Sequence, residues 1–145
     1  MRKINDIGFE LIKCFEGFGS VPYKCPAGYN TIGFGHVIKK GEKFSSITIE
    51  EAEELLRKDI EIAEDAVARY IRADISDNQF SSLVSFTFNL GSGALQRSTL
   101  RQKINYGSAL EDICDEFLKW IYAGGVKMQG LLRRRHAESM VYYGG

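Results

Sequence analysis

The pattern of apolar and polar positions predicts a chain made mostly of helices. Apolar residues recur every three or four positions, the spacing that gathers them on one helical face. They do so in five stretches: 4–15, about 48–71, 76–90, 108–121 and 131–142. A further short helix is expected near residues 98–105. Three of the helix starts carry a capping box, in which a hydroxyl residue and an acid or amide three positions later satisfy each other's backbone N–H groups. These boxes are Thr48 with Glu51, Ser76 with Gln79, and Ser108 with Glu111.

Residues 21–38 follow a different pattern. Glycines alternate there with Tyr, Thr, Ile, Phe and Val, which predicts a small, irregular antiparallel sheet with tight turns. A small sheet followed by many helices is an α+β architecture with a helical majority. With 145 residues and no linker or repeat, we expect a single domain, residues 1–145.

Several single residues stand out against the helical pattern. Asp59 falls on the inward stripe of the long helix, where a carboxylate needs a partner. Trp120 lies in an apolar helix and is expected in the core, with sugar stacking as the alternative. Cys14 and Cys114 also fall on helix stripes and are expected to fill the core as free thiols.

Charge and hydropathy narrow the function classes. The net charge is zero, and one basic run, Arg133 to His136, is weak support for a nucleic-acid partner, so none is expected. No apolar stretch approaches the roughly 20 residues that span a bilayer, so we expect no membrane insertion. The N-terminus has the charges and periodicity of a helix rather than the apolar core of a signal peptide. No metal-ligand spacing or cofactor motif occurs, and none is expected.

The strongest chemical signal is one acid followed by two groups at fixed spacing. Glu16 is followed after eight residues by Cys25, and Cys25 after five more by Thr31. The segment between them is rich in Gly, Pro and Tyr, which predicts an exposed turn or hairpin. A carboxylic acid facing groups that hold a water is the minimum equipment for hydrolysing a glycosidic bond.

This spacing resembles the phage-type lysozymes, the endolysins of glycoside hydrolase family 24, in their Cys-containing form. TIGFGH (31–36) matches the glycine-rich segment that follows the family motif. Three later blocks match in family order: FTFNLGSGALQRSTLRQKIN (86–105), FLKWIYAGG (117–125) and GLLRRRHAE (130–138). The resemblance implies a lysozyme-like fold, with a small sheet lobe and a helical lobe joined by the long helix and a sugar groove between the lobes.

The resemblance implies a role for each member of the motif. Glu16 would be the general acid that protonates the leaving glycosidic oxygen, and Thr31 would bind the attacking water. The family usually has Asp where this chain has Cys25. An unperturbed thiol has a pKa of about 8.5 and is a poor base at neutral pH. Three possibilities follow: its pKa is lowered, it only positions water, or it attacks the sugar. Water attack inverts the anomeric centre and a covalent intermediate retains it; we favour water attack with inversion.

Supporting residues are also implied by the family pattern. His36 and Asp59 resemble an ion pair between the sheet and the long helix. Arg134 is expected to pair with Glu16, with Arg133 and Arg135 as competitors. The expected sugar-binding residues are Asn89, Gly91, Ser98, Thr99, Gly130 and Leu131.

The expected function is an endolysin-type muramidase. It would hydrolyse the β-1,4 bond between N-acetylmuramic acid and N-acetylglucosamine in bacterial peptidoglycan. The alternatives are a lytic transglycosylase, which releases a 1,6-anhydro sugar, and a non-hydrolytic peptidoglycan-binding domain. We expect a monomer that stays cytoplasmic until a holin-type membrane lesion gives it access to the cell wall.

Overall fold

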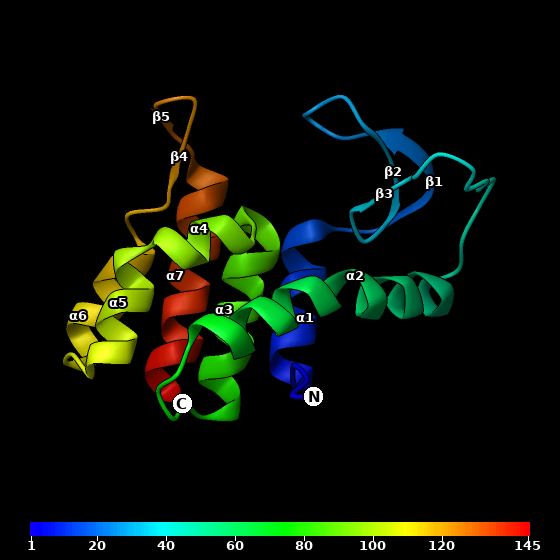
Figure 1. Cartoon of the computed structure of the whole chain (residues 1–145). Helices are drawn as coiled ribbons and strands as arrows, with labels where there is room; N and C mark the ends of the chain where they lie inside the picture. The colour runs from blue at the N-terminus through cyan, green and yellow to red at the C-terminus, as the bar shows by residue number, and fades with distance from the viewer. The chain divides into compact units, whose positions relative to one another are not determined.

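The computed structural model describes all residues, 1–145, and confirms the mostly helical α+β class (Figure 1). The helices are α1 (Asp6–Glu16), α2 (Ile49–Tyr70), α3 (Asp77–Leu90), α4 (Ser92–Arg97), α5 (Thr99–Tyr106), α6 (Leu110–Phe117) and α7 (Gln129–Gly144). The strands are β1 (Gly19–Lys24), β2 (Asn30–Gly33), β3 (His36–Val37), β4 (Tyr122–Ala123) and β5 (Val126–Lys127). None of the helices is long and apolar enough to cross a bilayer.

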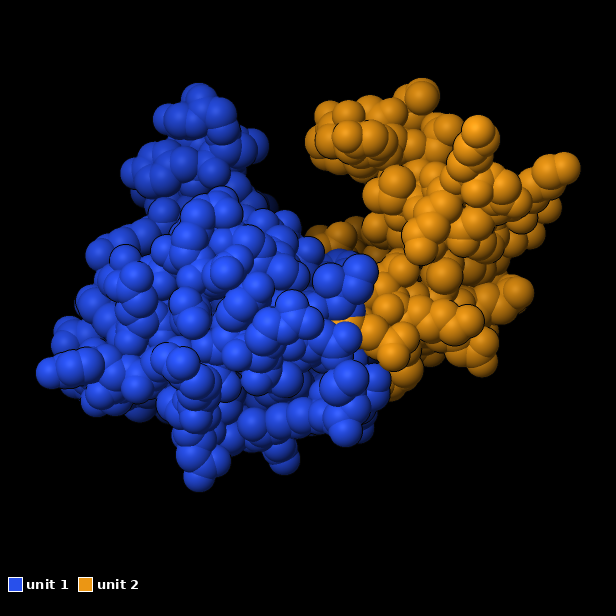
Figure 2. All heavy atoms as spheres, viewed as in Figure 1, with its two compact units in different colours: residues 1–11, 62–145 blue, residues 12–61 orange.

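The chain divides into two compact units, coloured separately in Figure 2. Unit 1 contains residues 1–11 and 62–145, and unit 2 contains residues 12–61. Helices α1 and α2 each contribute residues to both units, since the divisions fall within them. Unit 2 therefore holds the end of α1, the three-stranded sheet and the first half of α2.

Unit 2 is built around an antiparallel sheet in the order β1-β2-β3. The β1–β2 pairing shifts register between Gly19 and Tyr23, a bulge that bends the strand. Residues 31–33 of β2 are buried, and Ile32 is fully buried. The other buried apolar residues of unit 2 are Ile12, Phe34, Ile47, Ala52, Leu56 and Ile60. This core fixes the sheet and thereby the residues of the Glu16–Thr31 motif.

Unit 1 is a helical assembly organised around α3, in which every residue from Phe80 to Thr87 is buried. Helix α7 packs along α3, and α6 packs on α7 (Figure 1). Aromatic rings fill the space between these helices: the Phe86 centroid lies 5.7 Å from those of Phe117 and Trp120. Trp120 thus packs against the core through Phe86, as expected, but it is itself only partly buried, and the sugar-stacking alternative stays open.

Two of the three predicted capping boxes are present. Thr48 and Glu51 exchange hydrogen bonds of 2.9 and 3.1 Å before α2, and Ser76 and Gln79 form the reciprocal pair before α3.

The box predicted at Ser108 and Glu111 is wrong. The residue before α6 is Ala109, which makes no side-chain cap. The Ser108 N–H instead bonds to the Lys103 carbonyl (3.0 Å), completing a left-handed turn at Gly107 that ends α5. Ser108, which the pattern assigned to the start of α6, therefore belongs to the turn that ends α5.

Other local expectations need correction. Cys14 is exposed rather than a core residue. It follows Ile12 by two positions, which places it on the opposite side of α1 from that fully buried residue. Cys114 is partly buried, with its sulfur 3.6 Å from the Ser139 carbonyl oxygen. The prediction also missed α4 and the β4–β5 hairpin, whose loop is the pair Gly124–Gly125.

Candidate functional site

Glu16 is the last residue of α1, and its side chain lies against the β2–β3 turn. One turn earlier, Lys13 pairs with Glu53 of α2 at 2.6 Å, with its ammonium 5.5 Å from the centre of the Phe34 ring. These contacts tie the end of α1 to the rest of unit 2. A Cβ added at Gly35 would lie 2.5 Å from Glu16 Oε1. Gly35 therefore provides the space that the carboxyl group occupies.

Cys25 opens a tight turn after β1. Its N–H donates to the Tyr29 carbonyl (2.9 Å), and the Gly28 N–H donates to the Cys25 carbonyl (2.8 Å). Gly28 has φ +88°, which favours glycine. Hydrogen bonds to the sulfur from the Tyr29 backbone, and further ones from Ala27, Thr31 and Gly28, lower the pKa of the Cys25 thiol against the opposing effect of desolvation. The turn thus favours the thiolate.

Thr31 stands in β2 with only 2% of its surface exposed. Its hydroxyl donates to the Tyr29 carbonyl at 3.0 Å and also lies within hydrogen-bonding reach of the Cys25 sulfur. A hydroxyl has one hydrogen and two lone pairs, so it can donate to one of these groups while accepting elsewhere. Cys25 and Thr31, which have five residues between them in the sequence, are therefore in contact; their expected part in binding a water stays a prediction.

Tyr23 joins this group, although the sequence analysis did not single it out. It is the direct antiparallel partner of Thr31. Burial, followed by the negative charges of Glu16 and Cys25, raises the pKa of Tyr23, while a hydrogen bond from the Gly35 backbone acts in the opposite direction. The small sheet, the turn after β1 and the end of α1 therefore bring together an acid, a thiol, an alcohol and a phenol.

His36 makes the expected ion pair with Asp59, with Nδ1 and Oδ2 2.7 Å apart. Its other nitrogen, Nε2, lies 3.0 Å from Glu42 Oε1, a partner that the sequence analysis missed. Burial works to lower the pKa of His36, but the hydrogen bonds and charges of Glu42 and Asp59 outweigh it and raise the pKa. The imidazole thereby links β3 to α2 and satisfies the carboxylate on the helix stripe.

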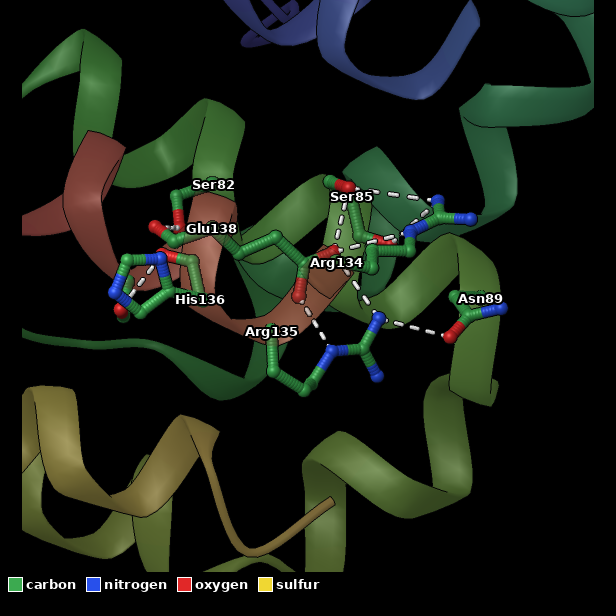
Figure 3. Close-up of polar contacts among 8 residues, drawn as sticks. Ser82, Ser85, Asn89, Arg134, Arg135, His136 and Glu138 are labelled. Carbon is green, nitrogen blue, oxygen red and sulfur yellow. Dashed lines mark hydrogen bonds and ion pairs between the residues drawn. The ribbon is translucent and has the colours of Figure 1, made fainter. Parts of the chain in front are cut away.

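The basic run of α7 contains a buried cluster of charges in unit 1 (Figure 3). Arg134 and Arg135 are 4% and 0% exposed, whereas Arg133 is exposed. Both buried guanidinium groups pair with Glu138, at 3.3 Å from Arg134 Nε and 2.7 Å from Arg135 Nε. The Ser85 hydroxyl of α3 donates to Glu138 Oε2 at 2.6 Å.

The geometry within this cluster is uneven. Arg135 Nε and Glu138 Oε1 are close, but neither has an aligned hydrogen-bond partner, so charge rather than a directed bond holds that contact. Arg135 Nη2 makes directed bonds of 3.2 Å to Glu138 Oε2 and 2.8 Å to Asn89 Oδ1. Burial raises the pKa of Glu138, and the two arginines and Ser85 oppose that rise. The pairing of Arg134 with Glu16 stays a prediction.

The expected sugar-binding residues of unit 1 have different surroundings. Asn89 is exposed at the end of α3 and is held by Arg135 (Figure 3). Ser98 is 1% exposed, accepts from the Arg101 N–H and donates to the Leu95 carbonyl, so its side chain serves as the cap of α5. Gly91, Thr99 and Gly130 are exposed, and Leu131 is partly exposed. No three His, Cys, Asp or Glu side chains lie close enough to hold a metal ion.

A small antiparallel sheet that carries the Glu–Cys–Thr motif, together with a helical unit around α3 and α7, is a lysozyme-like fold. Comparison with solved structures agrees. The muramidase domain of SpmX from Asticaccaulis excentricus superimposes with a TM-score of 0.87 and 32% identity, covering 98% of both chains. A crystal structure of a P22 lysozyme mutant gives a TM-score of 0.87 and 32% identity over 98% of this chain and 99% of that one.

Sequence comparison identifies the family. The phage lysozyme family model matches residues 13–138. An endolysin of Salmonella phage P22 is 33% identical over 144 residues, covering 97% of this chain and 98% of its own length. An endolysin of Bacillus phage B103 is 40% identical over 144 residues, covering 98% of this chain but 54% of its own length. This chain belongs to the phage lysozyme family, and it spans about half the length of the Bacillus phage relatives that it matches.

Proposed function

We propose that this chain is an endolysin-type muramidase that hydrolyses the β-1,4 bond between N-acetylmuramic acid and N-acetylglucosamine in bacterial peptidoglycan. The observation that carries the proposal is the grouping of Glu16, Cys25 and Thr31 on unit 2, in a chain of the phage lysozyme family. Glu16 lies against Gly35, and Cys25 contacts Thr31. Acid and water-binding groups thus belong to one sheet and the helix end beside it.

In the proposed reaction, Glu16 gives its proton to the oxygen of the leaving sugar as the glycosidic bond breaks. A water molecule held by Thr31 and Cys25 attacks the anomeric carbon. The lowered pKa of Cys25 supports a share of thiolate, which can accept the proton of that water. Attack by water from the opposite face inverts the anomeric centre. Direct attack by the thiolate would retain it, so the product anomer distinguishes the two roles of Cys25.

The residues proposed to bind the saccharide on unit 1 are Asn89, Gly91, Thr99, Gly130 and Leu131. An exposed amide such as Asn89, fixed by Arg135, suits the hydroxyl and N-acetyl groups of a sugar. The Ser98 hydroxyl is buried and already both donates and accepts a hydrogen bond within the protein. We therefore propose that Ser98 contributes to saccharide binding indirectly, by fixing the shape of the α4–α5 junction. We propose that Arg134 holds Glu16 and that the chain acts as a monomer.

The test is the identity of the products released from purified peptidoglycan. Hydrolysis yields reducing muropeptides, whereas a lytic transglycosylase yields 1,6-anhydro products lighter by one water. Mass spectrometry before and after borohydride reduction separates them. The proposal predicts reducible muropeptides; anhydro products would favour the transglycosylase. Sedimentation of the protein with peptidoglycan, without any released fragment, would favour the wall-binding alternative.

A further inference from the structure

The packing of Tyr23 is unusual for a tyrosine on an exposed strand. A Cβ added at Gly19 would lie 2.4 Å from Tyr23 Cε1 and 2.6 Å from Cδ1. The ring therefore lies directly against the backbone of Gly19, at the bulge where the β1–β2 register shifts. This close approach requires glycine at position 19, and it fixes the direction of the ring.

The Tyr23 ring lies on the same side of the sheet as Thr31 and close to Glu16. Tyr23 and Thr31 are opposite each other across β1 and β2, and residues paired in this way present their side chains on the same face of a sheet. The Gly35 backbone, which hydrogen-bonds to the Tyr23 oxygen, is also the surface on which the Glu16 carboxyl lies. Glu16 and Tyr23 thus meet at one residue of the β2–β3 turn.

The hydroxyl of Tyr23 has a donor to spare. The Gly35 N–H uses one lone pair of the phenol oxygen, and the phenolic hydrogen is not needed for that bond. Tyr23 is 37% exposed, so a ligand can reach it. Burial, followed by the negative charges of Glu16 and Cys25, raises the pKa of Tyr23, so the hydroxyl stays protonated as a donor.

We propose that Tyr23 is a further catalytic residue of this site, whose hydroxyl, oriented by Gly35 and Gly19, donates a hydrogen bond to an oxygen of the bound saccharide beside Glu16. The proposal rests on the muramidase function proposed above. It assigns to the motif a fourth polar group, which binds the sugar and leaves the protonation and the water to Glu16, Cys25 and Thr31. The ligand class is an N-acetylated glucosamine-type sugar, whose hydroxyl, ring and carbonyl oxygens all accept hydrogen bonds.

The test compares Tyr23→Phe with the matched change Tyr106→Phe, at a tyrosine of α5 that is 87% exposed. Phenylalanine keeps the ring against Gly19 and removes only the hydroxyl. For Tyr23→Phe we expect kcat/KM on peptidoglycan fragments to fall roughly 3- to 10-fold, the effect of losing one hydrogen bond. The rate at which iodoacetamide alkylates Cys25 should stay at the wild-type value because the turn is intact, and the Tm should fall by no more than about 6 °C, the effect of losing the single hydrogen bond to Gly35. Tyr106→Phe should match wild type in all three measurements.

Two outcomes would overturn the proposal. A kcat/KM of Tyr23→Phe within about twofold of wild type would show that the hydroxyl does not contact the reacting sugar. A loss of activity accompanied by a larger fall in Tm or by altered Cys25 alkylation would show a structural role instead. Failure of the wild type to release fragments would contradict the proposed function itself. The activity of the wild type is therefore measured before any variant is compared.

Discussion

Arg135, a guanidinium with no exposed surface, donates a 2.8 Å hydrogen bond to the exposed Asn89 at the end of α3. The same side chain pairs with Glu138, which is itself fully buried. A buried charge network therefore holds a surface amide in place. This connects the stability of the helical unit to one of the residues proposed to bind the saccharide.

Replacing Arg135 should be strongly destabilising. Arg135→Met fills similar volume but removes one of the two cations that face Glu138, and breaking a buried pair from one side costs about 3–5 kcal/mol. Urea unfolding followed by circular dichroism measures the free energy of unfolding. The control is Arg133→Met, at the exposed neighbouring position, which should change it by less than about 0.5 kcal/mol. Equal losses of unfolding free energy in the two variants would mean that the buried charge network does not stabilise the fold.

Gly35→Ala should damage activity more than stability. Gly35 has φ +77°, and the added Cβ would lie 2.5 Å from Glu16 Oε1. The left-handed backbone alone costs about 1–2 kcal/mol, and a displaced acid can lose roughly 100-fold in rate.

The matched control for Gly35→Ala is Gly41→Ala. Gly41 has φ +92°, and an added Cβ would meet nothing within 4 Å. Both variants should lose similar unfolding free energy in urea, but only Gly35→Ala should lose kcat on peptidoglycan fragments. Equal activities of the two variants would argue against the contact between Gly35 and Glu16.

The His36 ion pairs predict a specific dependence of stability on pH. The pKa of His36 is raised in the folded protein, so protonated His36 stabilises the fold fully below its unfolded pKa of about 6.5. This contribution is lost as the pH rises through the higher folded pKa. The difference in unfolding free energy between wild type and His36→Gln should therefore shrink as the pH rises above about 6.5 and through the raised pKa of folded His36. His136→Gln, at an exposed histidine of α7, serves as the control; a His36→Gln difference that grows with pH would contradict the assignment.

Cys25 should react as a thiolate at lower pH than Cys114. Hydrogen bonding from the Tyr29 backbone and neighbouring groups lowers the pKa of Cys25, whereas burial raises the pKa of Cys114. Iodoacetamide labelling followed by peptide mass spectrometry gives the pH midpoint for each cysteine in the same sample. We expect the Cys25 midpoint below that of Cys114, and the reverse order would remove the support for a partly ionised Cys25.

The proposed role of Cys25, holding the attacking water and accepting its proton, also makes a prediction for activity. Cys25→Asp restores the usual family residue and should keep hydrolysis, while Cys25→Ala should lose most of it because nothing then accepts the proton of the water. Full activity of Cys25→Ala in a turbidity assay on peptidoglycan would exclude the side chain from the mechanism.

What the sequence could predict depended on whether the signal was local. The spacing of Glu16, Cys25 and Thr31 identified the motif, and the apolar stripe that contains Asp59 correctly demanded a partner, found in His36. Glu42 and Tyr23 were missed because their roles depend on how turns fold back over the sheet. Local signals gave a wrong prediction where two of them overlapped. Ser108 fits the start of a capping box for α6, but its N–H bonds to the Lys103 carbonyl in the glycine turn that ends α5.

The buried charge cluster of α7 also depends on tertiary packing, which the local sequence pattern does not reveal. Three consecutive arginines are equivalent in sequence, and only packing against α3 buries Arg134 and Arg135 and exposes Arg133. The hydrogen bond from Arg135 to Asn89 could not be predicted, because the two residues are 46 positions apart in the sequence. The Gly124–Gly125 pair, by contrast, is a local hairpin signal between two short apolar runs, so the β4–β5 hairpin could have been predicted from the sequence.

The proposed role of Glu16 as proton donor is tested by Glu16→Gln, with Glu10→Gln, at an exposed acid on the same helix, as the control. The amide keeps the size of the side chain but cannot donate a carboxyl proton. The measurement is the rate at which reducing ends appear from purified peptidoglycan at equal protein concentration. We expect Glu10→Gln to match wild type and Glu16→Gln to lose at least about 100-fold in this rate. A Glu16→Gln variant as active as Glu10→Gln would contradict that role.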